Sequence, residues 1–141
     1  MIDLKLLERK PEDGKSYFED YKQGLLNRGA SLETLEKIMQ LASKRREAMT
    51  QAETEKAKQN KLSAEVGQLK REGKDASSIL AEVDSLKGHV KELEINAAQA
   101  DADVQLLLLT IPNKPHSSVP VGSSEKENKI VKTVGEPTKL D

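Results

Sequence analysis

Residues 79–111 read ILAEVDSLKGHVKELEINAAQADADVQLLLLTI, a stretch in which apolar side chains recur at alternating steps of four and three. All ten positions of this series are apolar, namely Ile79, Val83, Leu86, Val90, Leu93, Ala97, Ala100, Val104, Leu107 and Ile111. A heptad pattern kept over this length is typical of a coiled-coil helix whose apolar seam packs against a second helix. We therefore predict a helix over residues 76–110.

A partner helix is predicted over residues 31–72, which contain no proline and a single glycine. One heptad phase fits this stretch, with seam positions Ile38, Leu41, Arg45, Ala48, Ala52, Glu55, Gln59, Leu62, Val66 and Leu69. Seven of these ten are apolar, and Arg45 is interpreted as structural because it lies in the seam. The two series share one antiparallel register, in which the numbers of facing residues always sum to 145.

That register places the turn at residues 72–73, so both helices are expected to belong to one intramolecular hairpin. Gly73 is suited to end the first helix and Asp75 to cap the second, within a tip at residues 70–75. A helix of this length gives an arm about 60 Å long at 1.5 Å per residue.

The N-terminal residues 1–30 predict two short helices at the base of this arm. Asp3 is expected to cap the first, and the second is expected to run from Pro11 to Arg28 and to stop at Gly29. The three aromatic residues of the chain, Tyr17, Phe18 and Tyr21, lie in this second helix. We interpret them as a local core rather than as a platform for stacked bases.

The C-terminal residues 111–141 differ in character from the arm. Residues 111–122 form a proline-rich connector, and residues 129–134, which read KIVKTV, predict a short strand stopped by Gly135-Glu136-Pro137. Because a single strand is not stable, its partner must come from elsewhere. The fold class predicted is thus all-α: a two-helix coiled-coil hairpin with two short base helices in residues 1–110, then a connector with one short strand.

Composition excludes several classes of protein. The chain has 141 residues, a net charge of −1 and no cysteine, so disulfides, thiolate zinc sites and cysteine nucleophiles are excluded. The sequence contains no run of 18 apolar residues that could span a membrane, and its N-terminus lacks the apolar run of a signal peptide. We therefore expect a cytoplasmic protein. His89 and His116, the only two histidines, are interpreted as surface residues. We expect no catalytic or metal-binding residue in this chain.

Charge is segregated between the two arm helices. Residues 44–74 carry nine bases and five acids, a net charge of +4, whereas residues 75–109 carry two bases and seven acids, a net charge of −5. One interpretation is charge pairing between the helices, and the other is a basic edge that contacts phosphates. Since no aromatic residue follows Tyr21, such an edge would recognise the shape of a nucleic-acid backbone rather than stacked bases.

Several segments, taken in order, point to a known family. They are Met1-Ile2-Asp3-Leu4-Lys5-Leu6-Leu7 with Pro11, Lys44-Arg45-Arg46, Gln59-Asn60-Lys61-Leu62-Ser63 with Val66-Gly67, the tip Lys70-Arg71-Glu72-Gly73-Lys74-Asp75, Ile111-Pro112-Asn113-Lys114-Pro115-His116 through Val119-Pro120-Val121-Gly122, and Gly135-Glu136-Pro137. With these segments the chain resembles the N-terminal tRNA-binding domain of bacterial-type seryl-tRNA synthetase, a serine–tRNA ligase. The resemblance covers essentially all 141 residues.

The resemblance implies that the arm binds the long variable arm and elbow of serine tRNA through backbone and shape contacts. It also implies a homodimer in which one subunit's arm guides tRNA to the other subunit's active site, with neither DNA nor a membrane as partner. Serine activation with ATP and Mg²⁺ would take place in a class II catalytic domain that follows residue 141. The 141 residues alone are not expected to be catalytic.

Site residues follow from the resemblance and are named by their numbers in this chain. Six basic residues are expected to contact phosphates: Lys56, Lys58, Lys61, Lys70, Arg71 and Lys74. Asn60 and Ser63 are expected to donate hydrogen bonds to phosphate or 2′-hydroxyl groups. Two alternatives remain open, a prefoldin-like coiled-coil chaperone subunit and a purely structural coiled-coil adaptor.

Overall fold

The computed structural model describes residues 2–9 and 16–135, in which every regular element is helical. The elements are α1 (Leu4–Glu8), α2 (Tyr17–Asn27), α3 (Glu33–Arg71), α4 (Ser77–Thr110) and a 3₁₀ turn, η1 (Glu125–Glu127). They form two compact units: the arm, Thr34–Ile111, and a second unit that joins Met1–Glu33 to Pro112–Asp141. No helix within the described ranges is long and apolar enough to cross a membrane.

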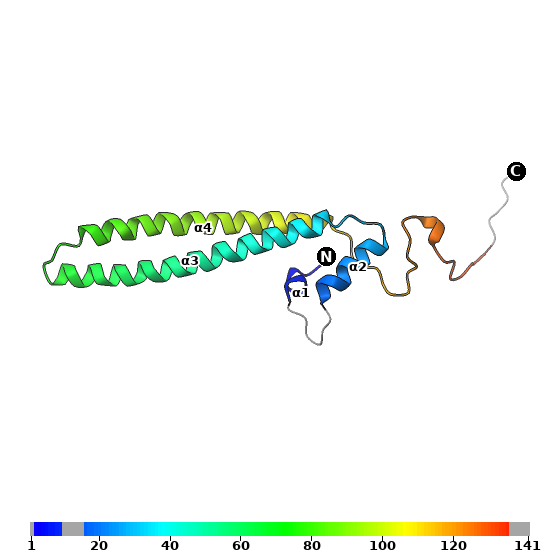
Figure 1. Ribbon diagram of the computed structural model, residues 1–141, viewed down its shortest axis with the longest axis horizontal. Coiled ribbons are helices and arrows are strands. Elements are labelled where there is room, and N and C mark those ends of the chain that lie inside the picture. Colours follow the sequence, from blue (N-terminus) through cyan, green and yellow to red (C-terminus); the bar gives the residue numbers. More distant parts are fainter. Residues whose placement is uncertain (1, 10–15, 136–141) are drawn as a thin grey trace. The chain divides into compact units, whose positions relative to one another are not determined.

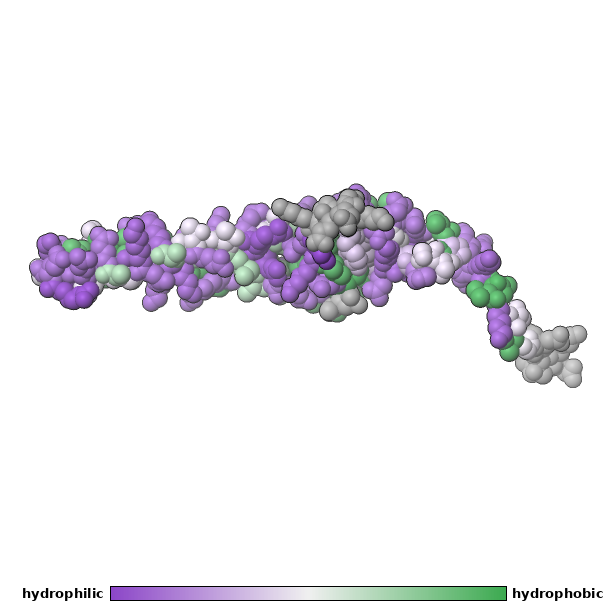
Figure 2. All heavy atoms as spheres, turned by 90° about the horizontal axis from the view of Figure 1, so that it is seen from below, coloured by the Kyte–Doolittle hydropathy of each residue, from purple (hydrophilic) through white to green (hydrophobic). Residues whose placement is uncertain are grey.

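The arm is an antiparallel hairpin of α3 and α4 (Figure 1), as predicted. All twenty seam positions are buried or half-buried, and none is exposed, which confirms the heptad phase of both helices. In mid-arm, Ala48, Ala52, Leu93 and Ala97 form a buried cluster. The 39 residues of α3 correspond to a length of about 58 Å at 1.5 Å per residue. Most of the arm surface seen in Figure 2 is hydrophilic, as expected for a helix pair that lies in water.

The predicted register is confirmed by four side-chain contacts that cross between the helices: the ion pairs Arg45–Asp101, Lys56–Glu94 and Lys58–Glu82, and the contact between Glu55 and His89. The residue numbers of these pairs sum to values between 140 and 150, centred on 145. Because a shift by one heptad would move these sums by seven, the pairing of the helices is fixed by both apolar and charged residues.

The tip has the expected turn chemistry. Gly73 has a φ of 68°, the left-handed conformation that favours glycine at the end of a helix. The Asp75 carboxylate accepts a hydrogen bond from the backbone N–H of Ser77 at 2.9 Å. The N-cap itself is Ala76, so α4 begins at Ser77, one residue later than predicted, while Asp75 still satisfies a backbone donor of its first turn.

In the second unit, Asp3 caps α1 as predicted, and Leu4 and Leu7 are buried. Of the aromatic residues, Tyr21 is fully buried, whereas Tyr17 and Phe18 are half-buried, in agreement with a local core. The Tyr21 hydroxyl donates a 2.6 Å hydrogen bond to the Pro112 carbonyl oxygen, so the aromatic core also holds the start of the connector.

The ends of α2 agree with the sequence only in part. Ser16 caps α2, which begins at Tyr17; the predicted start at Pro11 lies outside the described residues. At the other end, Gly29 has a φ of 68°, as its stop signal predicts. Ser31 accepts a hydrogen bond from the N–H of Glu33, the first residue of α3, at 3.2 Å.

The predicted strand at residues 129–134 is wrong for this structure, because these residues form no strand. Their side chains are exposed, with Ile130 at 80%, Val131 at 94% and Val134 at 80%. The described ranges place no second strand beside them, and a strand without a hydrogen-bonding partner does not persist. Of the stop Gly135-Glu136-Pro137, only Gly135 lies within the described residues.

Candidate nucleic-acid interface

All eight predicted site residues are exposed on the half of the arm nearest the tip. Seven lie on α3 between residues 56 and 71, and Lys74 lies in the turn. The structure does not bring them together on one face, however. At about 100° per residue, α3 distributes them over two flanks of the seam and its back.

The first flank is defined by Lys56, Asn60, Ser63 and Lys70, and we name it the Lys56 flank. These residues follow one another at steps of four, three and seven, so they form one row beside the seam of α3. The facing row of α4 contains Glu94, whose carboxylate lies 3.7 Å from the Lys56 ammonium. By the same register, Lys87 faces Ser63.

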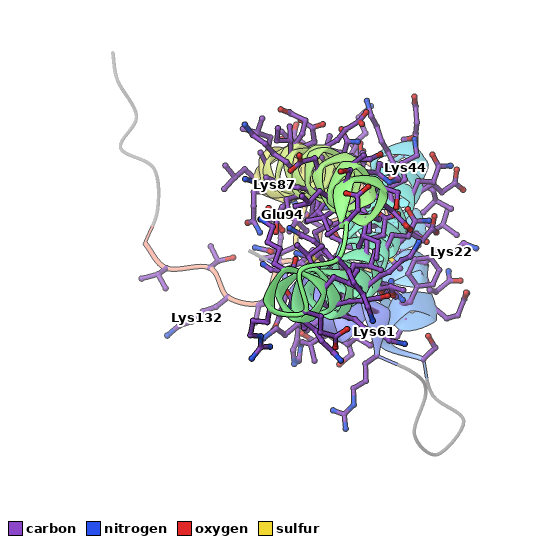
Figure 3. The ribbon with its side chains drawn as sticks, turned by 90° about the vertical axis from the view of Figure 1, so that its left-hand side faces the viewer. Lys22, Lys44, Lys61, Lys87, Glu94 and Lys132 are labelled. Carbon is purple, nitrogen blue, oxygen red and sulfur yellow. The ribbon has the colours of Figure 1, made fainter. Side chains whose placement is uncertain are left out.

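Lys87 and Lys91 are the two bases of α4 between residues 77 and 110, and both belong to the Lys56 flank. Sequence reasoning missed them because it assigned the whole of α4 to the acidic side of the arm. Their heptad positions were the signal that could have identified them, since Lys87 follows the seam residue Leu86 and Lys91 follows the seam residue Val90, on the side that faces Lys56. In Figure 3, Lys87 and Glu94 lie on one side of the hairpin and Lys61 on the other.

The second flank is defined by Lys58 and Lys61, and acids share it. The Lys58 ammonium lies 2.6 Å from the Glu82 carboxylate. Glu65 and Glu72 follow Lys58 at steps of seven on the same row. Lys74 pairs with Glu72 at 2.7 Å, and hydrogen bonds from Lys74 and then Gln68 hold the pKa of Glu72 below its ordinary value. The second flank is therefore less positive than the first.

Among the described residues, four lysines near the tip have no carboxylate within ion-pair distance: Lys61, Lys70, Lys87 and Lys91. Three of these belong to the Lys56 flank. Arg71 points to the back of α3, where its Nε donates to the Gly67 carbonyl oxygen at 3.1 Å. Charge pairing between the helices therefore holds for Lys56 and Lys58, whereas Lys70, Lys87 and Lys91 have no ion-pair partner among the described residues.

A shallow groove of about 490 Å³ continues the Lys56 flank toward the base of the arm. Ala52, Ala97 and Ala98 line it, and the ion pairs Arg45–Asp101 and Lys56–Glu94 border it. Arg45 is thus held within the hairpin, as its seam position predicts. The small alanine side chains leave room for a ligand to approach the arm closely on this flank.

The two histidines are exposed, as expected. His89 Nδ1 lies 2.8 Å from the half-buried Glu55 carboxylate, and His116 Nδ1 lies 2.9 Å from the Ser118 hydroxyl. Across the described part of the chain, no group of three or more histidine, aspartate or glutamate side chains is placed to hold a metal ion.

Comparison with known proteins supports one family. Residues 1–115 match the family described as Seryl-tRNA synthetase N-terminal domain. A serine–tRNA ligase of Bdellovibrio bacteriovorus is 68% identical over 140 residues, covering 99% of this chain and 32% of that protein. A serine–tRNA ligase of Listeria welshimeri is 36% identical over 141 residues, covering 100% of this chain and 31% of that protein.

The fold is similar to that of a solved ligase as well. The crystal structure of seryl-tRNA synthetase from Pyrococcus horikoshii complexed with ATP matches 90% of this chain and 27% of that chain, with a TM-score of 0.75 and 27% identity. The chain thus spans about a third of the length of these relatives. The prefoldin-like and adaptor alternatives are not favoured, since the chain belongs to the family of seryl-tRNA synthetase N-terminal domains.

Proposed function

We propose that this chain is the tRNA-binding domain of a serine–tRNA ligase and that its arm binds the backbone of serine tRNA at the long variable arm and elbow. The observation that carries the proposal is the Lys56 flank, where the amines of Lys70, Lys87 and Lys91 have no carboxylate partner among the described residues. An ammonium group without a partner can neutralise a phosphate and release its counterion without first giving up an internal ion pair.

The geometry favours shape over sequence as the basis of recognition. The exposed flank carries amines, the Asn60 amide and the Ser63 hydroxyl, which bind phosphate and 2′-hydroxyl groups and position a nucleic acid. It has no aromatic side chain on which a base could stack. A rigid arm that reads a double-stranded backbone would therefore distinguish tRNAs by the presence of a long variable arm.

Within the predicted set we assign different roles. Lys56, Asn60, Ser63 and Lys70 form the main surface, with Lys87 and Lys91 added from α4. Lys58, Lys61 and Lys74 would make secondary contacts because Glu82 and Glu72 make their side of the arm less positive, and Arg71 would do so because it points to the back of α3.

The activity of the whole protein is part of the same proposal. The full-length ligase would join serine to tRNA with ATP and Mg²⁺ as a cytoplasmic homodimer, with one subunit's arm presenting tRNA to the other subunit. The described residues of this chain do not fit a Mg²⁺ site, since they offer no suitable acid cluster. This domain would therefore contribute by binding and orienting the tRNA.

A gel-shift titration tests the proposal. Serine tRNA is compared with the same tRNA whose long variable arm has been replaced by a short one. We expect the chain to bind the intact tRNA at least about tenfold more tightly at moderate salt, a difference of about 1.4 kcal/mol. Equal affinity for both tRNAs would contradict recognition of the variable arm.

A further inference from the structure

The base of α4 carries a second apolar surface that no part of the arm covers. It consists of five exposed residues, which we name the basal stripe: Ile95, Ala98, Ala102, Leu106 and Leu109. The exposed fractions of its three large side chains are 58% for Ile95, 63% for Leu106 and 70% for Leu109.

The basal stripe is one continuous face of the helix. Its members follow at steps of three, four, four and three, so at 100° per residue they fall within about 80° of one another. The centre of this face is about 170° from the centre of the seam formed by Ala97, Ala100 and Val104. The stripe is therefore on the opposite side of α4 from α3, and the coiled coil cannot bury it.

This part of α4 also lacks the charges that keep a helix face in water. Residues 104–113 contain no charged side chain, and the last two turns, residues 104–111, are apolar at six of eight positions. In contrast, the half of α4 nearest the tip carries charges on its outward positions, among them Asp84, Lys91 and Glu92. A helix that is apolar on opposite faces is typical of one that is packed on both sides in a larger protein.

We propose that the basal stripe is the docking surface for the part of the ligase that follows residue 141. The chain spans 32% and 31% of the length of two relatives, so about two thirds of such a protein would be available to cover it. Because only about 32 residues separate Leu109 from residue 141, the segment that follows stays tethered near the stripe. Such a tether gives the following segment an effective concentration in the millimolar range, well above that of a second copy.

The surroundings of the stripe define the chemistry of the partner surface. Asp101 borders the stripe on one side and Asp103 on the other. Because Arg45 already pairs with Asp101, we infer an apolar ridge with a basic residue on the side that faces Asp103. Docking there would limit the angle of the arm relative to the rest of the enzyme. The inference rests on family membership and is independent of tRNA binding.

Cysteine protection tests the docking, because this chain has no cysteine of its own. Leu109→Cys is introduced into the full-length ligase and into the 141-residue chain. Both proteins are labelled with a maleimide in the absence of tRNA, and mass spectrometry follows the labelling of the peptide that contains residue 109. Ala81→Cys is the matched control, since Ala81 is exposed on nearly the same outward face of α4 but near the tip. We expect Leu109→Cys to react at least tenfold more slowly in the full-length ligase, and Ala81→Cys to react equally in both.

Equal reactivity of Leu109→Cys in the two proteins would overturn the proposal. Slow labelling of Leu109→Cys in the 141-residue chain would also overturn it. If the slow rate depends on protein concentration, a second copy covers the stripe. If it does not, the N-terminal unit of the same chain covers it. A second variant keeps the test independent of one position: Leu106→Glu in the full-length ligase should restore fast labelling at an Ile95→Cys reporter, and an unchanged slow rate would contradict docking along the stripe.

Discussion

Glu55 of α3 and His89 of α4 meet across the arm, with the Glu55 carboxylate 2.8 Å from His89 Nδ1. Glu55 occupies a seam position, and its side chain is only 25% exposed. An acid in the seam of a coiled coil costs stability unless it is paired, while it also helps to select a single register. His89 is the basic side chain that lies beside it, although Glu55 Oε2 accepts no hydrogen bond from the described residues.

His89→Ala should therefore destabilise the arm by about 1 kcal/mol, because it removes the basic side chain that lies beside a partly buried carboxylate. His116→Ala is the matched control, since His116 is exposed and its ring hydrogen-bonds to Ser118 alone among the described residues. Urea unfolding followed by circular dichroism at 222 nm measures both variants. Equal stability of the two would show that the Glu55–His89 pair contributes nothing.

Gln59→Leu should stabilise the arm by about 1 kcal/mol. Gln59 is half-buried in the seam, and the confirmed register places it opposite Leu86, so a leucine would bury apolar surface where an amide now lies. The same unfolding assay measures the change. A lower midpoint than that of the original chain would mean that the seam has no room for leucine at this layer.

Two glycines should respond in opposite directions to alanine. Gly73 has a φ of 68°, so Gly73→Ala should cost about 1 kcal/mol through strain at the tip. Gly88 lies inside α4 with no atom near its Cβ position, so Gly88→Ala should stabilise the helix by about 0.5 to 1 kcal/mol. Thermal unfolding of both variants checks the signs. Stabilisation by both would contradict the turn conformation at Gly73.

The second unit should lose stability at alkaline pH through Tyr21. Burial, then the nearby Tyr17, raises the pKa of the Tyr21 hydroxyl to about 12. Because the raised pKa favours the neutral phenol in the folded state, this stability is fully present below pH 10 and is lost as pH rises from about 10 through 12. The loss is roughly 3 kcal/mol at most. Tyr21→Phe should remove this dependence at the cost of the hydrogen bond to Pro112.

Urea unfolding at pH 9 and pH 11, followed by near-ultraviolet circular dichroism of the aromatic residues, measures this effect. Tyr17→Phe is the control, since Tyr21 remains in that variant. If the free energy of unfolding of the original chain is the same at pH 9 and at pH 11, the burial of the Tyr21 hydroxyl is contradicted.

The arm could be predicted from the sequence because the residues that specify it recur at heptad spacing or lie close together in the turn. Ten apolar positions from Ile79 to Ile111 determine one helix face, and Gly73 with Asp75 determines the turn. The strand at residues 129–134 could not be decided in the same way, since β-branched residues such as Val131 form a strand only beside a partner. Local composition does not supply that partner.

The candidate interface was predicted less completely. Net charge identified α3 as the basic helix, but charge counted along a helix ignores which side each residue faces. Lys87 and Lys91 lie on the acidic helix and still join the Lys56 flank, whereas Lys58 lies on the basic helix and is paired with Glu82. Which lysines remain unpaired depends on side-chain positions across two helices, and only the structure provides them.

The Lys56 flank should account for most of the salt dependence of tRNA binding. We expect the double variant Lys70→Gln and Lys87→Gln to weaken binding of serine tRNA by about tenfold and to reduce the slope of log K against log salt by about two, since two phosphate contacts are lost. Circular dichroism should show unchanged helicity, because both side chains are exposed and unpaired among the described residues.

The most direct test of the account is therefore the salt dependence of serine tRNA affinity for this double variant, compared with Lys37→Gln and Lys132→Gln. The control removes the same charge from two exposed lysines that do not belong to the Lys56 flank. We expect the flank variant to bind serine tRNA more weakly and with a smaller slope of log K against log salt. The affinity and the slope of the control variant should match those of the original chain. Equal affinities and slopes for the two double variants would contradict the claim that the Lys56 flank binds the tRNA backbone.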